Sequence, residues 1–202
     1  FAATSNAPGE LVRRLASQPD RSSIGRDDLV EIVATKNAQG AGVARLRKSA
    51  AENSEAEVRR ATALAFAKTQ SKPLEAIDAL RKLHGVEVAT ASAILSWCKP
   101  DIWPVIDQRA LSALVSFGIL PRRRVGPPQR DEWVPYVKIV SDLSHRLGWP
   151  PQRIDRWLYA FDKCQLTAED LVATIADPPE ESQSSETTRE GIRPQATLVG
   201  YM

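Results

Sequence analysis

The segment from Leu80 to Asp107 constrains the fold more than any other part of the chain. It reads LRKLHGVEVATASAILSWCKPDIWPVID. An amphipathic run ends in a tight turn at His84-Gly85-Val86-Glu87, and a second run of small and apolar residues follows. Glycine supplies the positive φ that such a turn requires. The segment therefore predicts two helices joined by a short hairpin, then an apolar stretch that ends in a single carboxylate.

Helical spacing of apolar residues dominates the rest of the chain, and no convincing strand pattern precedes residue 195. Ser54 and Glu57 form a capping box, Pro73 suits the first turn of a helix, and Gly118 and Gly148 mark helix ends. The expected helices cover about 11–15, 27–34, 43–50, 54–68, 73–83, 88–98, 107–118, 133–147, 154–161 and 171–175. The sequence predicts an all-α helical bundle that contains a helix-hairpin-helix motif.

Three regions follow from this pattern. Residues 1–70 are expected to form N-terminal helices that pack on the core, and residues 71–176 form the core with the hairpin. Residues 177–202 are polar and poor in aromatic residues, so we expect a disordered tail.

Charge is distributed unevenly, although the formal net charge is only +2. Residues 80–130 carry eight lysines and arginines against three acidic residues, whereas residues 177–202 carry five acidic residues against two arginines. The acidic end therefore masks a basic middle, which is the part of the chain suited to a polyanion.

Two isolated cysteines, Cys98 and Cys164, and two separated histidines, His84 and His145, lack the spacing of a metal site. We expect reduced thiols and no metal or other cofactor. Because there is neither a secretory signal nor an apolar run of about 18 residues, we expect a cytoplasmic protein without a membrane partner.

The hairpin has a physical use beyond packing. In a helix-hairpin-helix motif, backbone N–H groups of the turn and of the second helix point at a DNA phosphate. Leu83, Gly85, Val86 and the Thr90-Ala91 pair fit that pattern. Glu87 replaces a second glycine, and its carboxylate either repels a phosphate or acts as a favourable acid in the first turn. The alternative is a plain pair of helices packed in a helical protein.

These residues resemble the helix-hairpin-helix DNA glycosylase superfamily, whose signature is a Leu-x-Gly-Val-Gly hairpin, a Thr-Ala pair and a downstream Val-Asp. The corresponding residues are Leu83 to Glu87, Thr90-Ala91 and Ile106-Asp107. The resemblance is sharp over residues 74–115 and weaker through Ile154 to Tyr159, which looks like a late core helix of uncharacterised bacterial relatives.

The resemblance implies that Asp107 is the catalytic carboxylate. Cleavage of an N-glycosidic bond builds positive charge on the sugar, which an ionised carboxylate stabilises while it orients or deprotonates water. The alternative role is a helix N-cap, for which Asp is a favoured residue.

Relatives that also cut the DNA strand use a lysine in the second helix as a nucleophile. Alignment through the hairpin and Asp107 puts Ala89 at that position, and alanine cannot form a Schiff base. The resemblance therefore implies a monofunctional enzyme, and the four-cysteine loop of an iron–sulfur cluster is absent from the sequence.

Further DNA contacts are expected from basic residues near Asp107, with solvent-exposed loop residues as the alternative. A flipped base needs an aromatic pocket wall, although core packing is the more common use for each of these side chains. The expected DNA-binding residues are His84, Gly85, Val86, Glu87, Ala89, Thr90, Arg109, Arg122, Arg123 and Arg124. The aromatic candidates are Trp97, Trp103, Trp157 and Tyr159.

We therefore expect a monofunctional DNA glycosylase that acts on a damaged or modified base in double-stranded DNA and is associated with the nucleoid. A non-catalytic helix-hairpin-helix protein that only binds DNA is the alternative, and a helical interaction module is a third reading. The sequence names neither the base nor any protein partner.

Overall fold

The computed structural model describes residues 7–18, 21–38, 42–123 and 125–164. Within these ranges every regular element is an α-helix, which confirms the all-α prediction. The helices are α1 (Ala7–Ala16), α2 (Arg26–Lys36), α3 (Val43–Ala51), α4 (Glu55–Phe66), α5 (Pro73–Leu80), α6 (Val88–Cys98), α7 (Gln108–Ser116), α8 (Arg130–Leu147) and α9 (Pro151–Cys164).

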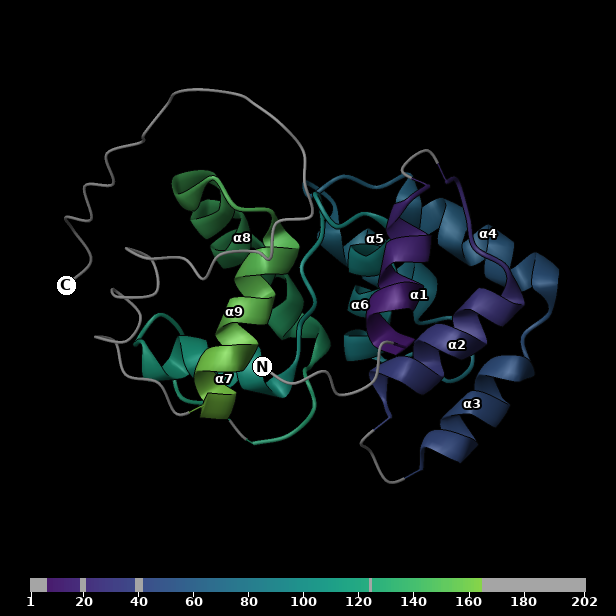
Figure 1. Ribbon diagram of the computed structural model, residues 1–202, viewed down its shortest axis with the longest axis horizontal. Coiled ribbons are helices and arrows are strands. Elements are labelled where there is room, and N and C mark those ends of the chain that lie inside the picture. Colours follow the sequence, from purple (N-terminus) through teal and green to yellow (C-terminus); the bar gives the residue numbers. More distant parts are fainter. Residues whose placement is uncertain (1–6, 19–20, 39–41, 124, 165–202) are drawn as a thin grey trace.

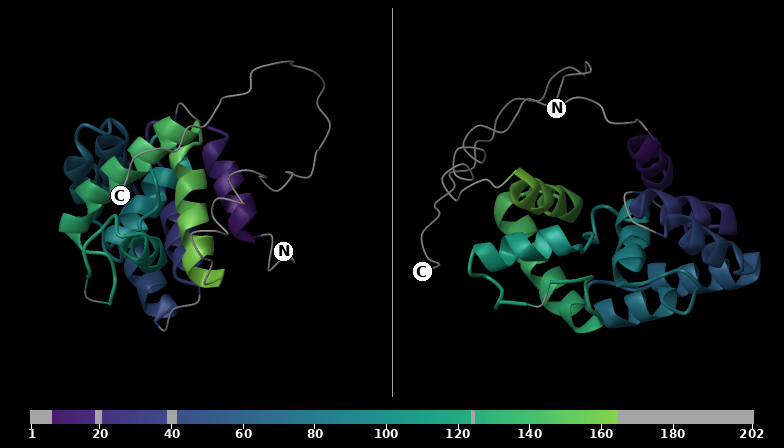
Figure 2. Two further views of the ribbon diagram at one scale, coloured as in Figure 1. Left: turned by 90° about the vertical axis from the view of Figure 1, so that its left-hand side faces the viewer. Right: turned by 90° about the horizontal axis from the view of Figure 1, so that it is seen from below.

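The helices form two groups. Figure 1 shows α1 to α6 on one side and α7 to α9 on the other, and the right-hand view of Figure 2 shows the same division. In the first group α2 packs on α3 and α4 on α5; in the second, α7 and α8 pack on α9. Helix α8 also packs on α5, so it joins the two groups.

The predicted helix starts have the expected chemistry. The Ser54 hydroxyl accepts the Glu57 amide at 3.2 Å, and the Glu57 carboxylate accepts the Ser54 amide at 2.8 Å, which confirms the capping box. Helix α5 ends at Leu80, three residues earlier than expected. The early end lets the following turn direct Leu83 and Val86 into the core, where both are buried.

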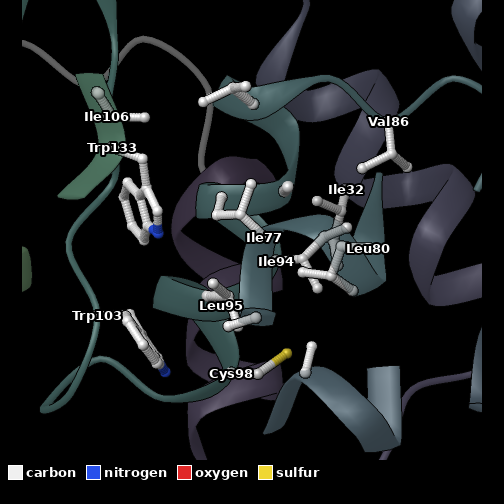
Figure 3. Packing of buried hydrophobic residues seen from close by; sticks show 14 of the residues in the cluster. Ile32, Ile77, Leu80, Val86, Ile94, Leu95, Cys98, Trp103, Ile106 and Trp133 are labelled. Carbon is white, nitrogen blue, oxygen red and sulfur yellow. The ribbon is translucent and has the colours of Figure 1, made fainter. Parts of the chain in front are cut away.

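Helix α6 is the central element of the first group and is buried along almost its whole length. It contacts α1, α2 and α5. Its small residues, such as Ala91, Ser92 and Ala93, allow three helices to approach it closely. Figure 3 shows Ile94 and Leu95 of this helix packed beside Ile77 of α5, with Trp103 on the flank.

The hydrophobic core continues from the first group into the second. One cluster of buried residues contains Leu11 and Ile32 as well as Trp133 and Ile154. The described residues end at 164. The expected helix at 171–175, the last part of the 71–176 region and the 177–202 tail therefore lie outside them. Among the described helices, none combines the length and apolarity of a membrane span.

Candidate functional site

Asp107 lies where an extended segment meets a helix. After α6 the chain reverses, and residues 103–106 run back beside that helix, so that the Ile106 amide donates to Ser92 Oγ in the second turn of α6 at 3.1 Å. Asp107 then caps α7: its Oδ1 accepts the Ala110 amide at 2.8 Å. The reversal brings Asp107 back toward the hairpin end of α6.

Lys36 is the cationic partner of Asp107. It is the last residue of α2, and its Nζ lies 3.7 Å from Asp107 Oδ2. The two side chains are 17% and 21% exposed, so the pair is accessible but largely enclosed. The helix cap and the ammonium group therefore contact the two different oxygens of the Asp107 carboxylate. The sequence analysis missed Lys36, because only the fold brings α2 beside α7.

Three buried side chains hold the backbone just before Asp107. Extended backbone inside a helical core has no ladder partner, so its polar groups need side-chain partners. Asp155 Oδ2 accepts the Val105 amide at 2.6 Å, and the Tyr136 hydroxyl donates to the Val105 carbonyl at 3.0 Å. Together with the Ser92–Ile106 bond, these contacts come from α6, α8 and α9. We call Ser92, Tyr136 and Asp155 the backbone clamp.

Burial controls the ionisation of two clamp members. It raises the pKa of Asp155 to about 7; the Val105 hydrogen bond and the charge of Lys36 oppose the rise, and the charge of Asp107 adds to it. Burial, with the charges of Asp155 and Asp107, also raises the pKa of Tyr136 well above its usual value. The sequence did carry a signal for Asp155, since this carboxylate adjoins the apolar stripe of α9.

The hairpin has the expected backbone but an unexpected neighbour. Gly85 has φ of +77°, the region that favours glycine. A Cβ at this position would meet the Leu46 carbonyl at 2.9 Å and the Ala50 amide nitrogen at 3.1 Å. The Asn53 side chain also accepts the His84 amide at 2.9 Å and donates to the His84 carbonyl at 3.1 Å. The close approach at Gly85 is therefore to α3.

The other predicted hairpin contacts divide into exposed and buried residues. His84 is exposed, and the Glu87 side chain is 81% exposed, 4.0 Å from Arg81. Val86 and Thr90 are buried, so their side chains serve packing. Ala89 is half-buried and its carbonyl accepts the Ser92 hydroxyl at 2.8 Å, which links the hairpin helix to the backbone clamp.

The predicted arginines differ in their surroundings. Arg109 pairs with Asp162 at 3.2 Å, and its guanidinium lies 5.7 Å from the centre of the Tyr159 ring. Arg123 pairs with Glu132 at 2.5 Å and is mostly buried, so it is engaged within the protein. Arg122 is exposed. Arg124 lies outside the described residues.

Helix α3 supplies cations that the sequence analysis did not single out. Arg45, Arg47 and Lys48 are exposed, and none forms an ion pair or side-chain hydrogen bond with another described residue. The helix has no acidic residue and braces the hairpin at Gly85. The signal in the sequence was the basic run VARLRKSAA, whose proximity to the hairpin is a tertiary feature.

The aromatic candidates are mainly packed together. Trp103 is fully buried and stacks on Trp133 with ring centres 6.0 Å apart, so it belongs to the hydrophobic core. Trp157 is half-buried and stacks on Phe117 at 5.9 Å. Trp97 and Tyr159 are also half-buried. Tyr159 lies beside a predicted DNA-binding residue, Arg109.

In the described part of the chain, no group of three histidine, cysteine, aspartate or glutamate residues is arranged to hold a metal ion. Cys98 is a buried free thiol, and burial raises its pKa to about 12, which makes it a poor nucleophile.

Comparisons with family models, curated proteins and solved structures found no match to this chain. The candidate site therefore rests on its own residues.

Proposed function

We propose that this protein is a base-excision enzyme, a monofunctional DNA glycosylase that hydrolyses the N-glycosidic bond of a damaged or modified base in duplex DNA. The observation that carries the proposal is the setting of Asp107. It is an accessible carboxylate that caps α7, pairs with Lys36, and follows a backbone segment held by three buried side chains. Such fixation suits a group that must face a reacting atom.

The chemistry asks little of the protein beyond this carboxylate. As the bond between the sugar C1′ and the base nitrogen lengthens, C1′ becomes electron-poor and the base takes the bonding electrons. The ionised Asp107 stabilises the positive sugar and accepts a proton from the water that attacks C1′. The departing base takes up one proton from solvent, and Asp107 returns its own proton to solvent. The products are the free base and an abasic site.

DNA binding is proposed for the hairpin together with the adjacent α3. Arg45, Arg47 and Lys48 are cations without an ion-pair partner among the described residues, and α3 contacts the hairpin turn. Unpaired lysines and arginines gain most from phosphate contacts, because no internal ion pair must break. An enzyme of this kind would work in the cytoplasm on nucleoid DNA.

The monofunctional part of the proposal rests on Ala89, which has no amine for a Schiff base. Lys36 does have one, beside Asp107. If the enzyme is monofunctional, incubation with abasic duplex DNA and borohydride should leave no covalent protein–DNA adduct. An adduct that disappears in Lys36→Ala would make the enzyme a lyase as well, with Lys36 as its nucleophile.

A non-catalytic DNA-binding protein remains a distinct second candidate. Two observations favour it: both Asp107 oxygens already have a partner, and the exposed Glu87 puts a negative charge at the hairpin. In this reading Asp107 only caps α7 and holds Lys36.

One experiment separates the two functions. The protein is incubated with duplex DNA carrying a mixture of lesions, and released bases are identified by mass spectrometry. We expect base release that falls about 10²–10⁴-fold in Asp107→Asn, with DNA binding retained. Asp101→Asn, an exposed carboxylate just before the extended segment, is the matched control and should keep activity. Binding without release from any lesion would leave the non-catalytic reading.

A further inference from the structure

We propose that Asp155 is a positioning residue for Asp107, and that its ionisation fixes Asp107 in place through the backbone clamp. This inference builds on the proposed function, in which Asp107 is the catalytic residue. Asp155 is buried below the accessible surface of the site, and it takes no part in the hydrogen bond by which Asp107 caps α7. It acts through the Val105 amide, two residues before Asp107.

The geometry makes this coupling direct. The Val105 peptide unit is held from two sides, by Asp155 at its N–H and by Tyr136 at its carbonyl. Ser92 holds the next N–H, that of Ile106. Asp107 therefore follows a fixed backbone, and its own orientation depends on how tightly these three bonds close.

Asp155 differs from the other two clamp members because its charge can change. An ionised carboxylate makes a shorter and stronger hydrogen bond to an N–H group than a neutral one does. The 2.6 Å distance is at the short end for an N–H···O bond, as suits an ionised acceptor. A side chain needed only to satisfy the Val105 amide could be neutral, and would avoid the cost of a buried carboxylate.

The charged groups around Asp155 come from several elements. Lys36 of α2 and Arg156 of α9 favour its ionised form, while Asp107 at the start of α7 disfavours it. Tyr136 of α8 is a further titratable neighbour among the described residues, and the α7–α9 ion pair of Arg109 with Asp162 is on the surface. These opposing effects, dominated by burial, put the pKa of Asp155 at about 7, so the bond strengthens across neutral pH.

The decisive experiment needs no enzymatic activity. Amide proton shifts of the full-length protein are followed by NMR from pH 6 to 8.5. In the wild type, the amides of Val105 and Ala110 should titrate together with a midpoint near pH 7, because the second amide reports the Asp107 cap. Asp155→Asn should abolish both titrations, and Asp142→Asn, an exposed carboxylate on α8, should keep them.

Two NMR results would overturn the inference. A Val105 titration that persists in Asp155→Asn would mean that another group causes it. A Val105 titration without any change at Ala110 would mean that Asp107 does not follow the clamp. If the amides behave as expected but no DNA releases a base, the inference holds and only the proposed enzymatic function fails.

Where a substrate lesion is found, the reaction adds a second readout. The single-turnover rate of base release should rise about tenfold between pH 6 and pH 8 in the wild type, as Asp155 goes from roughly one-tenth to nine-tenths ionised. Asp155→Asn should be slower at pH 8 and flat over this range, with DNA affinity unchanged. Tyr136→Phe should be slower but keep the wild-type midpoint. Wild-type rates and pH dependence in Asp155→Asn would contradict a positioning role.

Discussion

At the scale of single residues, burial of the Asp155 carboxylate lowers the free energy of unfolding at neutral pH. Its carboxyl is buried, and its pKa of about 7 in the folded protein lies above the ordinary value of 3.8. The folded state therefore holds a proton that the unfolded chain has already lost between those two pH values. It follows that the free energy of unfolding falls as pH rises from about 4 to about 7.

Asp155→Asn should remove this pH dependence. Asn keeps an oxygen for the Val105 amide and has no charge to bury. The variant should match the wild type near pH 4 and exceed it at pH 8, by at most about 4 kcal/mol. Urea unfolding at several pH values measures this difference, with Asp142→Asn as the control. A stability difference that does not vary with pH would show that the charge of Asp155 is not what costs stability.

The residues of the site were not equally visible in the sequence. Asp107 could be found because a helix cap is a local feature, set by the residue and the few positions after it. Lys36 and Tyr136 could not, because only the packing of distant helices brings them to the segment before α7. Asp155 could be predicted in part. Its position beside an apolar stripe suggested burial, but its partner Val105 is 50 residues away in the sequence and could not be identified from local residues.

At the scale of elements, α3 lies against the hairpin turn, and the two together are the proposed DNA-binding surface. The turn at Gly85 was predictable, since it depends on one glycine and its φ. Its support by α3 was not, because the contact joins the glycine to the backbone of another helix. The sequence predicted DNA contacts from the arginines at 122–124, but Arg123 is engaged by Glu132. Helix α3 carries exposed cations without an ion pair among the described residues, next to the turn.

Removal of two α3 cations tests this surface. Arg45→Ala combined with Arg47→Ala should weaken DNA binding and lower the slope of log K against log salt by up to about 1.8, since each lost phosphate contact removes about 0.9. The salt dependence of duplex binding, measured by fluorescence anisotropy, gives this slope. The pair Lys138→Ala with Lys163→Ala removes the same charge from α8 and α9, and should leave the slope nearly unchanged. Equal losses in both double variants would indicate attraction by net charge alone.

At the scale of the whole molecule, the candidate site depends on contact between the two groups of helices. Lys36 belongs to the first group, while Tyr136 and Asp155 belong to the second, and Asp107 lies on the chain between them. The sequence placed a boundary near residue 70 between helices that were expected to pack on one another, and α4 and α5 do pack across that point. The helices after α6 form the second group (Figure 1).

The joint between the groups is formed by Trp133. Its indole N–H donates to the Pro73 carbonyl at the start of α5 at 2.9 Å, and its ring stacks on Trp103. Because one continuous core spans both groups, we expect the protein to unfold in a single transition. Urea unfolding followed by tryptophan fluorescence and by far-ultraviolet circular dichroism should give coincident curves.

Trp133→Phe tests whether this joint carries the coupling. The variant keeps an aromatic ring but loses the hydrogen bond to Pro73 and part of the stacked surface, so its free energy of unfolding should fall by about 1–3 kcal/mol. Trp149→Phe, at a half-buried ring between α8 and α9 that contacts Arg153 of α9, should cost less. Since the second group holds Asp155 and the first holds Lys36, loosening the joint should also weaken base release more than the loss of stability alone explains. Two separate transitions in the wild type would instead make the groups independent domains, and the Lys36–Asp107 pair would then be a contact between domains.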